Sequence, residues 1–260
     1  MTKSKKYNVV PGAESFYIKG NEVGILLIHG FVGTPQSVEF LGKQFAEQGF
    51  TVLAPRLKGH GTHYKELENT YFDEWIEELE QAYLDLKKVC SQVFIVGQSM
   101  GGALALLLTK KKQPAGVITI NAALSVPGYE RYKTEEELLL VKEGKPDIKD
   151  DSVIEITYTF VPVHAIKQLL SIIETSKKQL SSVTCPLLLF KSPEDHVVPA
   201  SSTDFVYNRV SSDEKELVEL LNSYHVASMD FDKYTIVEKT VEFIVNILDR
   251  KIKHDNIKVS

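Results

Sequence analysis

The stretch VFIVGQSMGGALALLL, residues 93–108, joins two kinds of local structure through a glycine-rich turn. Its first four residues are β-branched or aromatic, which predicts a buried strand, and residues 103–108 predict a helix. Between them, Gly97-Gln98-Ser99-Met100-Gly101 forms a G-x-S-x-G pattern. A serine on a sharp strand-to-helix turn has a strained backbone and an exposed hydroxyl, which suits a nucleophile. Ser99 is therefore the candidate nucleophile.

Short apolar runs alternate with amphipathic helical patterns along much of the chain. Continuous apolar runs fit strands that are buried on both faces of a parallel sheet. Alternation of strands with helices favours an α/β fold with a mostly parallel, doubly wound sheet. The expected strands are 23–29, 51–54, 93–96, 116–120, 187–190 and 216–221, and the expected helices are 36–48, 72–89, 100–111 and 231–248.

Residues 125–180 interrupt this alternation, because they contain no comparable strand-like run. Residues 130–151 are densely charged, and residues 153–180 read as helical with apolar side chains on one face. An insertion of this length is usually functional, so we expect a small helical cap over a single domain that spans residues 1–260. The alternative is a charged surface excursion with no role at the site.

Composition excludes several classes of protein. The 260 residues are 43% hydrophobic and carry a net charge of −5, so the basic footprint of a nucleic-acid-binding protein is missing. The N-terminal residues lack the apolar run of a signal peptide, and no aliphatic stretch could span a bilayer. Cys90 and Cys185 form no metal-ligand spacing. We expect a cytoplasmic protein with reduced thiols, no metal, no integral membrane segment and no nucleic-acid partner. The sequence does not define an oligomeric state.

A second glycine-containing turn, His29-Gly30-Phe31-Val32-Gly33, follows the strand expected at 23–29. A turn of this kind after an early strand supplies one donor of an oxyanion hole, and the residue after the nucleophile supplies the other. The backbone N–H groups of Phe31 and Met100 are the expected donors. His29 is expected to support the turn from the core instead of taking part in chemistry.

The base is sought among the histidines that follow Ser99, because an enzyme with this turn carries its acid and then its histidine later in the chain. Those histidines are His164, His196, His225 and His254. His225 follows the last expected strand and precedes the last helix, and loops at the carboxyl ends of strands build the sites of open α/β sheets. His225 is therefore the expected base.

The acid should follow the preceding strand, where Glu194 and Asp195 are adjacent. A carboxylate at this point would hold the tautomer of the imidazole and stabilise its charged form. Glu194 and Asp195 both lie at the position where this carboxylate is expected, so their place in the chain does not choose between them.

Five motifs together resemble a known family: HGFVGTP (29–35), PRLKGHGTHY (55–64), GQSMGG (97–102), EDHVVP (194–199) and NSYHVA (222–227). They are similar to the small bacterial monoacylglycerol lipases and thermostable carboxylesterases of the α/β-hydrolase superfamily. The resemblance implies an α/β-hydrolase core, a compact helical lid, no cofactor, and hydrolysis of monoacylglycerols or of short to medium acyl esters through an acyl-enzyme. Ser99, Asp195 and His225 match its triad motifs, so Asp195 is favoured over Glu194, and Phe31 and Met100 match its oxyanion positions.

Three features depart from the family pattern or have no assigned role. Gln98 stands where an aliphatic residue is expected, and a buried amide there needs hydrogen-bond partners. The segment Gly59-His60-Gly61 has no chemical role that the sequence explains, and Glu155 is a candidate for the lid carboxylate near a glycerol head group that the resemblance implies.

Other functions on the same scaffold stay open. Acyl transfer or thioester hydrolysis would use the same triad, and a non-catalytic ligand-binding module would use only the fold. The charged first half of the insertion predicts a closed acyl tunnel without a broad apolar lid.

Overall fold

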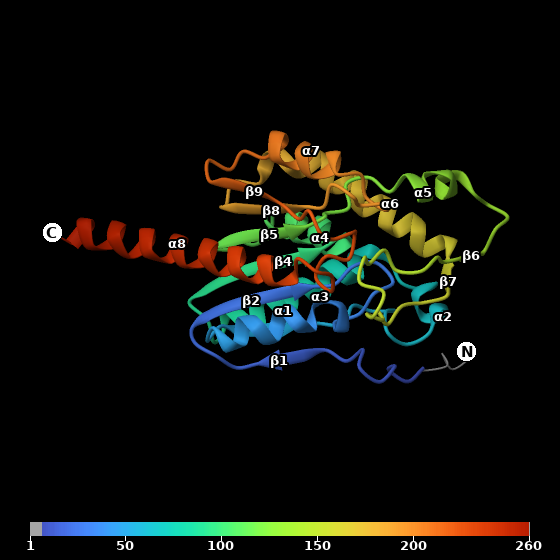
Figure 1. Cartoon of the computed structure of the whole chain (residues 1–260), viewed down its shortest axis with the longest axis horizontal. Coiled ribbons are helices and arrows are strands. Elements are labelled where there is room, and N and C mark those ends of the chain that lie inside the picture. The colour runs from blue at the N-terminus through green and yellow to red at the C-terminus, as the bar shows by residue number, and fades with distance from the viewer. Residues whose placement is uncertain (1–6, 260) are drawn as a thin grey trace.

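A mostly parallel sheet of seven strands forms the centre of the protein (Figure 1). The computed structural model describes residues 7–259, with side chains described as far as residue 251. The strand order is β1-β3-β2-β4-β5-β8-β9, and every neighbouring pair is parallel except β1 with β3. The bounds are β1 Phe16–Ile18, β2 Val23–Ile28, β3 Thr51–Ala54, β4 Gln92–Gln98, β5 Gly116–Ile120, β8 Leu187–Lys191 and β9 Lys215–Glu219.

All six strands expected in the sheet are present: 51–54 and 116–120 have the predicted bounds, and the other four have ends shifted by one or two residues. The sequence did not predict β1, which adds an antiparallel edge beside β3. With only three residues, β1 is too short to show a period of its own, and it is held by its pairing with β3.

Helices cover both faces of the sheet, as expected for a doubly wound fold. Helices α1 (Gln36–Glu47) and α8 (Lys233–Val259) lie on one face, and α3 (Phe72–Lys87), α4 (Met100–Leu108) and α6 (Val163–Gln179) lie on the other. In β2, Leu26 and Ile28 pack into the core on the α3–α4 face, whereas the intervening Ile25 and Leu27 pack on the α1–α8 face. This explains why each central strand reads as a continuous apolar run.

The insertion is less helical than its sequence suggested. It contains α5 (Pro127–Glu130), the 3-10 turn η1 (Arg131–Thr134), helix α6, and the strands β6 (Leu140–Lys142) and β7 (Phe160–Pro162), which pair antiparallel. A second 3-10 turn, η2 (Leu180–Ser182), begins at the last residue of the insertion. The expectation of helix over 153–162 is wrong. β-branched residues favour extended backbone there, and Pro162 disfavours helical conformation at the residue before it.

Helix α6 also packs into the body of the protein. The Ser176 hydroxyl donates to the carbonyl of Ala103 in α4 over 3.2 Å. A single domain with a cap over 125–180 stays a prediction, and the structure places the second half of that segment in the helix layer beside α4.

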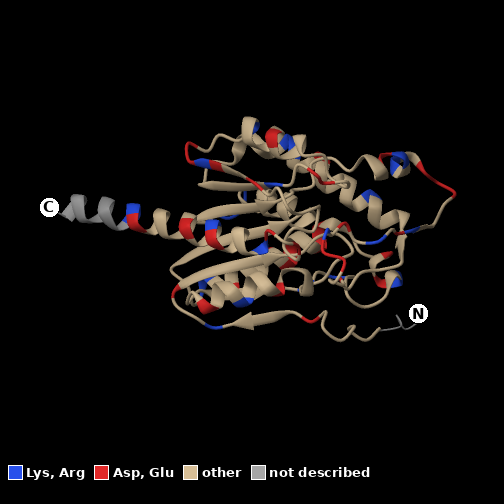
Figure 2. Ribbon diagram, in the orientation of Figure 1, with Lys and Arg blue, Asp and Glu red and all other residues tan. Residues whose placement is uncertain are grey.

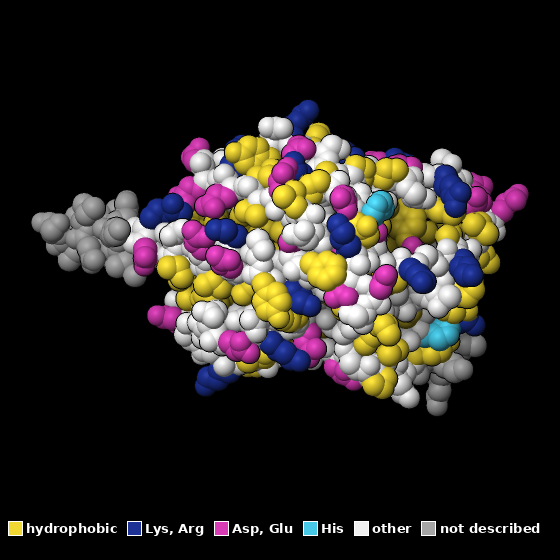
Figure 3. All heavy atoms as spheres, viewed as in Figure 1, with side chains coloured by type: hydrophobic (Ala, Val, Ile, Leu, Met, Phe, Trp, Pro, Cys, Tyr) yellow, Lys and Arg dark blue, Asp and Glu magenta, His cyan; other side chains and the backbone are white. Residues whose placement is uncertain are grey.

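The carboxyl ends of the central strands meet at one edge of the sheet. The segment between β6 and β7, residues 143–159, runs beside this edge and is called the connector below. In Figure 2 the central strands β2, β3, β4 and β5 are tan, and Asp, Glu, Lys and Arg lie mainly on helices and loops and on the edge strand β9. Charged side chains of both signs are interspersed on the face seen in Figure 3. Among the described residues, no helix is long and apolar enough to cross a membrane.

Candidate active site

Ser99 occupies the tight turn between β4 and α4. Its backbone is in the left-handed region, with φ 57° and ψ −119°, which is rare for a residue with a side chain. The turn is crowded: a Cβ on Gly97 would lie 2.2 Å from the Gly101 carbonyl oxygen, and a Cβ on Gly101 would lie 2.3 Å from that of Ile28. The two glycines of the motif are therefore required by packing, and they allow the serine side chain to project above the sheet.

A chain of hydrogen bonds connects Ser99, His225 and Asp195. The Oγ of Ser99 lies 2.8 Å from Nε2 of His225, and Nδ1 of His225 lies 2.7 Å from Oδ2 of Asp195. The second carboxylate oxygen of Asp195 accepts the backbone N–H groups of Val197 and Val198, and its side chain is only 1% exposed. Asp195 therefore fixes the tautomer in which Nδ1 carries the proton and Nε2 can accept one from Ser99.

The surroundings of His225 favour its protonated form. Burial lowers the pKa of the imidazole, but the charge of Asp195, its hydrogen bond, and the charges of Asp147 and Glu155 together raise that pKa above its ordinary value. An imidazolium formed during a reaction would be stabilised by the same groups.

The residues that competed with this set in the sequence lie elsewhere. Glu194 is exposed and pairs with Lys149 at 3.0 Å. The ring of His196 is exposed, and His164 donates from Nε2 to the carbonyl of Thr70. His254 lies outside the residues whose side chains are described. The structure thus brings Ser99, Asp195 and His225 together, whereas Glu194, His164 and His196 make their contacts elsewhere.

The turn after β2 lies against Ser99. A Cβ on Gly30 would come within 3.3 Å of the Ser99 Cβ, and Val32 has a left-handed backbone with φ 56°. In the described part of the chain, neither the N–H of Phe31 nor that of Met100 donates to a protein acceptor. Both donors remain available for an oxygen bound near Ser99.

His29 supports this turn from the core, as predicted. Its Nδ1 donates to the Gly30 carbonyl over 2.9 Å, and its Nε2 accepts the N–H of Leu57 over 3.2 Å. Burial lowers the pKa of His29 to about 4, so the ring is neutral.

The Gly59-His60-Gly61 segment has a packing role that the sequence did not reveal. Both glycines have positive φ, 78° and 62°, and turn the chain so that the His60 ring enters the core. That ring makes edge-to-face contacts with His29 and Phe31 at centroid distances of 5.1 and 6.2 Å. His60 therefore holds the turn that presents the Phe31 N–H.

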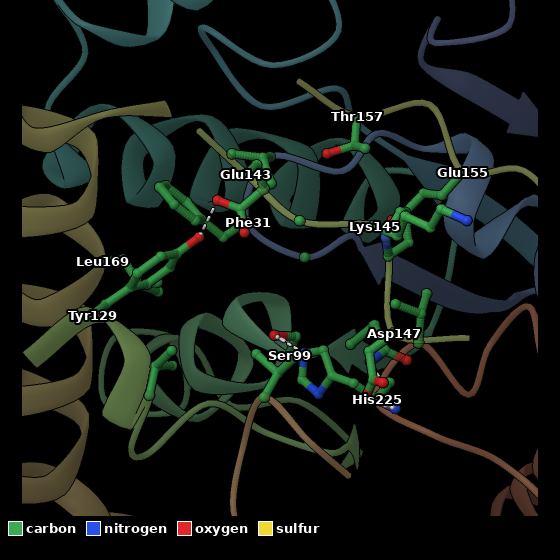
Figure 4. A pocket seen from close by; sticks show the side chains of 18 residues that line it. Phe31, Ser99, Tyr129, Glu143, Lys145, Asp147, Glu155, Thr157, Leu169 and His225 are labelled. Atoms are coloured by element: carbon green, nitrogen blue, oxygen red, sulfur yellow. Dashed lines mark hydrogen bonds between the residues drawn. The ribbon is translucent and has the colours of Figure 1, made fainter. Parts of the chain in front are cut away.

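A cavity of about 700 Å³, open mouth included, lies in front of Ser99. Ser99 and His225 lie side by side in Figure 4, and the connector residues Glu143 and Thr157 lie across the pocket from them. Its lining combines apolar side chains with polar groups of the connector: Phe31, Val126, Leu169, Val197, Tyr129, Glu143, Lys145, Asp147, Glu155 and Thr157. Burial raises the pKa of Glu155 to about 7.

The unusual Gln98 belongs to a polar network behind His225. Its Nε2 donates to the His225 carbonyl over 2.8 Å, whereas its Oε1 is buried without a partner. Asn121, at the end of β5, donates to the same carbonyl over 2.9 Å and accepts the N–H of Ser192 over 2.8 Å. Asn121 was not predicted from the sequence, although its place directly after an expected strand is a usable signal.

Asp147 was also missed. It lies in the charged half of the insertion, and nothing in the local sequence distinguishes it from its acidic neighbours. No group of three or more His, Cys, Asp or Glu side chains within the described residues could hold a metal ion.

Known proteins match this chain over most of its length. Residues 21–146 and 147–232 match the family model described as serine aminopeptidase, S33. The thermostable monoacylglycerol lipase of Bacillus sp. strain H-257 is 42% identical over 92% of this chain and 97% of its own. The carboxylesterase of Bacillus subtilis strain 168 is 26% identical over 88% of this chain and 95% of its own.

A solved structure of a lipolytic enzyme also matches this chain. One from work on the metagenome-derived lipolytic enzymes LipS and LipT superposes with a TM-score of 0.89 at 40% identity, over 92% of this chain and 100% of that chain. These matches confirm the resemblance predicted from the five motifs. The chain therefore belongs to the α/β-hydrolase family described as serine aminopeptidase, S33.

Proposed function

We propose that this protein hydrolyses carboxylic esters through an acyl-enzyme, with monoacylglycerols and short to medium acyl esters as its substrates. The observation that carries the proposal is the unbroken hydrogen-bond chain from Ser99 through His225 to Asp195. Relatives named as a monoacylglycerol lipase and a carboxylesterase support ester chemistry.

The first half of the reaction transfers the acyl group to the protein. His225 Nε2 takes the proton of Ser99 as Oγ attacks the ester carbonyl, and Asp195 stabilises the imidazolium that forms. The N–H groups of Phe31 and Met100 bind the carbonyl oxygen as it becomes negative; such a donor is worth about 10²–10³ in rate. The tetrahedral intermediate collapses, the C–O bond to the alcohol breaks, and His225 gives its proton to the departing alkoxide.

The second half releases the acid. A water molecule takes the place of the alcohol, His225 removes its proton, and the resulting hydroxide attacks the acyl carbonyl. Collapse of the second intermediate returns the proton to Ser99 Oγ, and the carboxylic acid leaves. No cofactor is needed for either half.

The pocket suits a small polyol ester. Its apolar side chains, including Val126 and Leu169, can receive an acyl chain, whereas Glu155 and Thr157 offer oxygens to an alcohol group. Because burial raises the pKa of Glu155, its carboxyl can donate as well as accept a hydrogen bond near neutral pH. These features support glycerol as the alcohol.

Two further expectations belong to this proposal. Both cysteines are free thiols, which fits a cytoplasmic location. The insertion exposes four large apolar side chains, Leu138, Leu139, Ile154 and Phe160, and they are interrupted in sequence by charged residues. We expect this surface to be too discontinuous for action on emulsified triacylglycerol.

Covalent labelling tests the nucleophile. A fluorophosphonate should modify Ser99 stoichiometrically and stop ester hydrolysis, because only an activated hydroxyl reacts rapidly. Ser99→Ala should keep its melting temperature within a few degrees and should not be labelled. Stoichiometric labelling of Ser99→Ala at another serine would refute the assignment.

A substrate panel tests the reaction class. Rates on monolaurin, p-nitrophenyl esters of graded length, triolein emulsion and an aminoacyl p-nitroanilide should be compared at equal concentrations of protein. We expect turnover of monolaurin and the shorter esters and little on triolein. Faster cleavage of the anilide would assign an aminopeptidase, and a jump in rate above the solubility limit would contradict the closed tunnel.

A further inference from the structure

One residue of the connector is bonded to both loops that carry the acid and the base. Oδ2 of Asp147 accepts the backbone N–H of His225 over 3.1 Å and that of His196 over 3.0 Å. Oδ1 accepts a hydrogen bond from Nδ1 of His196 over 2.9 Å, and the Asp147 carbonyl accepts the N–H of Val226 over 3.0 Å. Asp147 therefore links the loop that follows β8 to the loop that follows β9.

A second carboxylate, that of Asp230, belongs to the loop between β9 and α8 that carries His225, called the histidine loop below, and bonds to the connector. Asp230 is fully buried and accepts the backbone N–H groups of Lys149, Asp150 and Tyr224 at 2.7, 3.1 and 2.9 Å. Residues 147–150 are thus interlocked with the histidine loop by two carboxylates. Figure 4 shows Asp147 beside His225 in the pocket wall.

Hydrogen bonds fix the backbone of His225 at both its N–H and its carbonyl. Asp147 holds its N–H, while Gln98 and Asn121 hold its carbonyl from the sheet. A group used for proton transfer must stay within hydrogen-bond distance of both its partners, and a misplacement of about 1 Å can cost about 10²-fold in rate. Gln98 and Asn121, which bind the carbonyl, lie at the ends of the core strands β4 and β5, but Asp147, which binds the N–H, belongs to the insertion.

We propose that Asp147 is a positioning residue for the base: it holds the His225 backbone and the acid loop at the separation that the His225–Asp195 hydrogen bond requires. The insertion is then part of the catalytic apparatus and not only a cover for the pocket. This inference rests on the proposed function for its kinetic readout.

Asp147 has a geometric effect and a charge effect, and two variants separate them. In Asp147→Asn the amide oxygen can accept both backbone N–H groups, and the amide nitrogen can donate to Nδ1 of His196 in its other tautomer. This variant removes only the charge. Asp147→Ala removes the charge and the hydrogen bonds together.

The charged groups that face His225 are Asp195 from the acid loop and Asp147 and Glu155 from the connector. Loss of one negative charge disfavours the imidazolium, so the pKa of His225 should fall in both variants. This shift reports the charge of Asp147 beside the base, whereas a fall in kcat that is larger in Asp147→Ala than in Asp147→Asn reports its hydrogen bonds to the His225 and His196 loops.

The test measures kcat and KM for a soluble p-nitrophenyl ester as a function of pH, together with the NMR titration of the His225 ring in the resting protein. Asp147→Ala should lose about 10- to 100-fold in kcat with KM within about threefold, because the group acts on the base and not on binding. Asp147→Asn should keep most of kcat and move the pH profile and the NMR titration to lower pH. Asp151→Asn is the matched control, since Asp151 is exposed and makes no hydrogen bond or ion pair within the described part of the chain.

Each negative result has a distinct meaning. Wild-type protein without esterase activity would refute the proposed function, and the NMR titration would still test the placement of Asp147. An active wild type with Asp147→Ala indistinguishable from Asp151→Asn in kcat would overturn the positioning role. A loss of activity in Asp147→Ala that only tracks the unfolded fraction, with an unchanged His225 titration, would overturn it as well.

Discussion

Two amides contact the same carbonyl behind the site, and the structure predicts different costs for losing them. Asn121 is buried, donates to the His225 carbonyl, and is the acceptor for the N–H of Ser192. Gln98 makes one hydrogen bond, to the same carbonyl, and buries an oxygen that has no partner. We therefore expect Asn121→Ala to be strongly destabilising and Gln98→Met to be nearly neutral.

The magnitude for Asn121→Ala follows from two terms. Leaving the buried Ser192 N–H unpaired costs about 1–3 kcal/mol. Asn121 also has a left-handed backbone with φ 46°, which asparagine tolerates and which costs alanine about 1–2 kcal/mol. Allowing for partial relaxation, the free energy of unfolding should fall by about 2–4 kcal/mol.

For Gln98→Met the terms oppose each other. The lost hydrogen bond costs about 1 kcal/mol, but the change also removes the unpartnered oxygen, whose burial is itself unfavourable by a similar amount. The His225 carbonyl keeps its bond from Asn121, and methionine is close to glutamine in volume. The net change should lie within about 1 kcal/mol of zero.

Denaturant unfolding and calorimetry check both values. For a chain of this size about 1 kcal/mol shifts the melting temperature by about 2–4 °C, so Asn121→Ala should melt roughly 4–16 °C lower and Gln98→Met within about 4 °C of wild type. Asn121→Gly serves as a control, because glycine accepts the backbone conformation and should recover part of the loss. A Gln98→Met variant at least as unstable as Asn121→Ala would refute the reasoning.

Three further predictions concern titration and the acid. Because His225 must be neutral to act as base and its pKa is raised, kcat/KM should increase with pH through a value above 6.5 and then level off; a profile that is flat from pH 5 to 8 would contradict this role. Asp195→Asn should lose about 10⁴-fold in kcat by analogy with other triads, and its exposed neighbour variant Glu194→Gln should lose little; the reverse order would reassign the acid. Folding raises the pKa of Glu155 from about 4.5 to about 7, so ionisation of this carboxyl opposes folding. The destabilisation is absent below pH 4.5 and complete above about pH 7. Glu155→Gln should therefore stabilise the protein by about 1–3 kcal/mol at pH 8 and little at pH 4.5, and thermal melts at both pH values would show this.

The fold and the candidate triad could be predicted from sequence because their signals are local or follow a topological rule. Strands buried on both faces, such as Gly116–Ile120, must be apolar throughout, so they can be recognised without knowing their neighbours. The turn at Ser99 needs glycines two positions away on each side, because any side chain there would collide with backbone. His225 was found by its place after a strand in the order that this topology imposes.

The remaining features depend on contacts between segments far apart in the chain. The three-residue strand β1 exists because β3 offers it an open edge, and residues 153–162, whose apolar pattern resembled a helix, form no helix and end in β7. Asp147 meets the N–H of His225 across 78 positions, and Asn121 meets its carbonyl across 104. A carboxylate or an amide is equally suited to solvent and to such a contact, so neither residue carries a local signal of its role. The path of the loops at the carboxyl edge of the sheet decides which polar side chains are buried against His225. That path determines which backbone N–H and C=O groups lose contact with water and therefore need a hydrogen-bond partner.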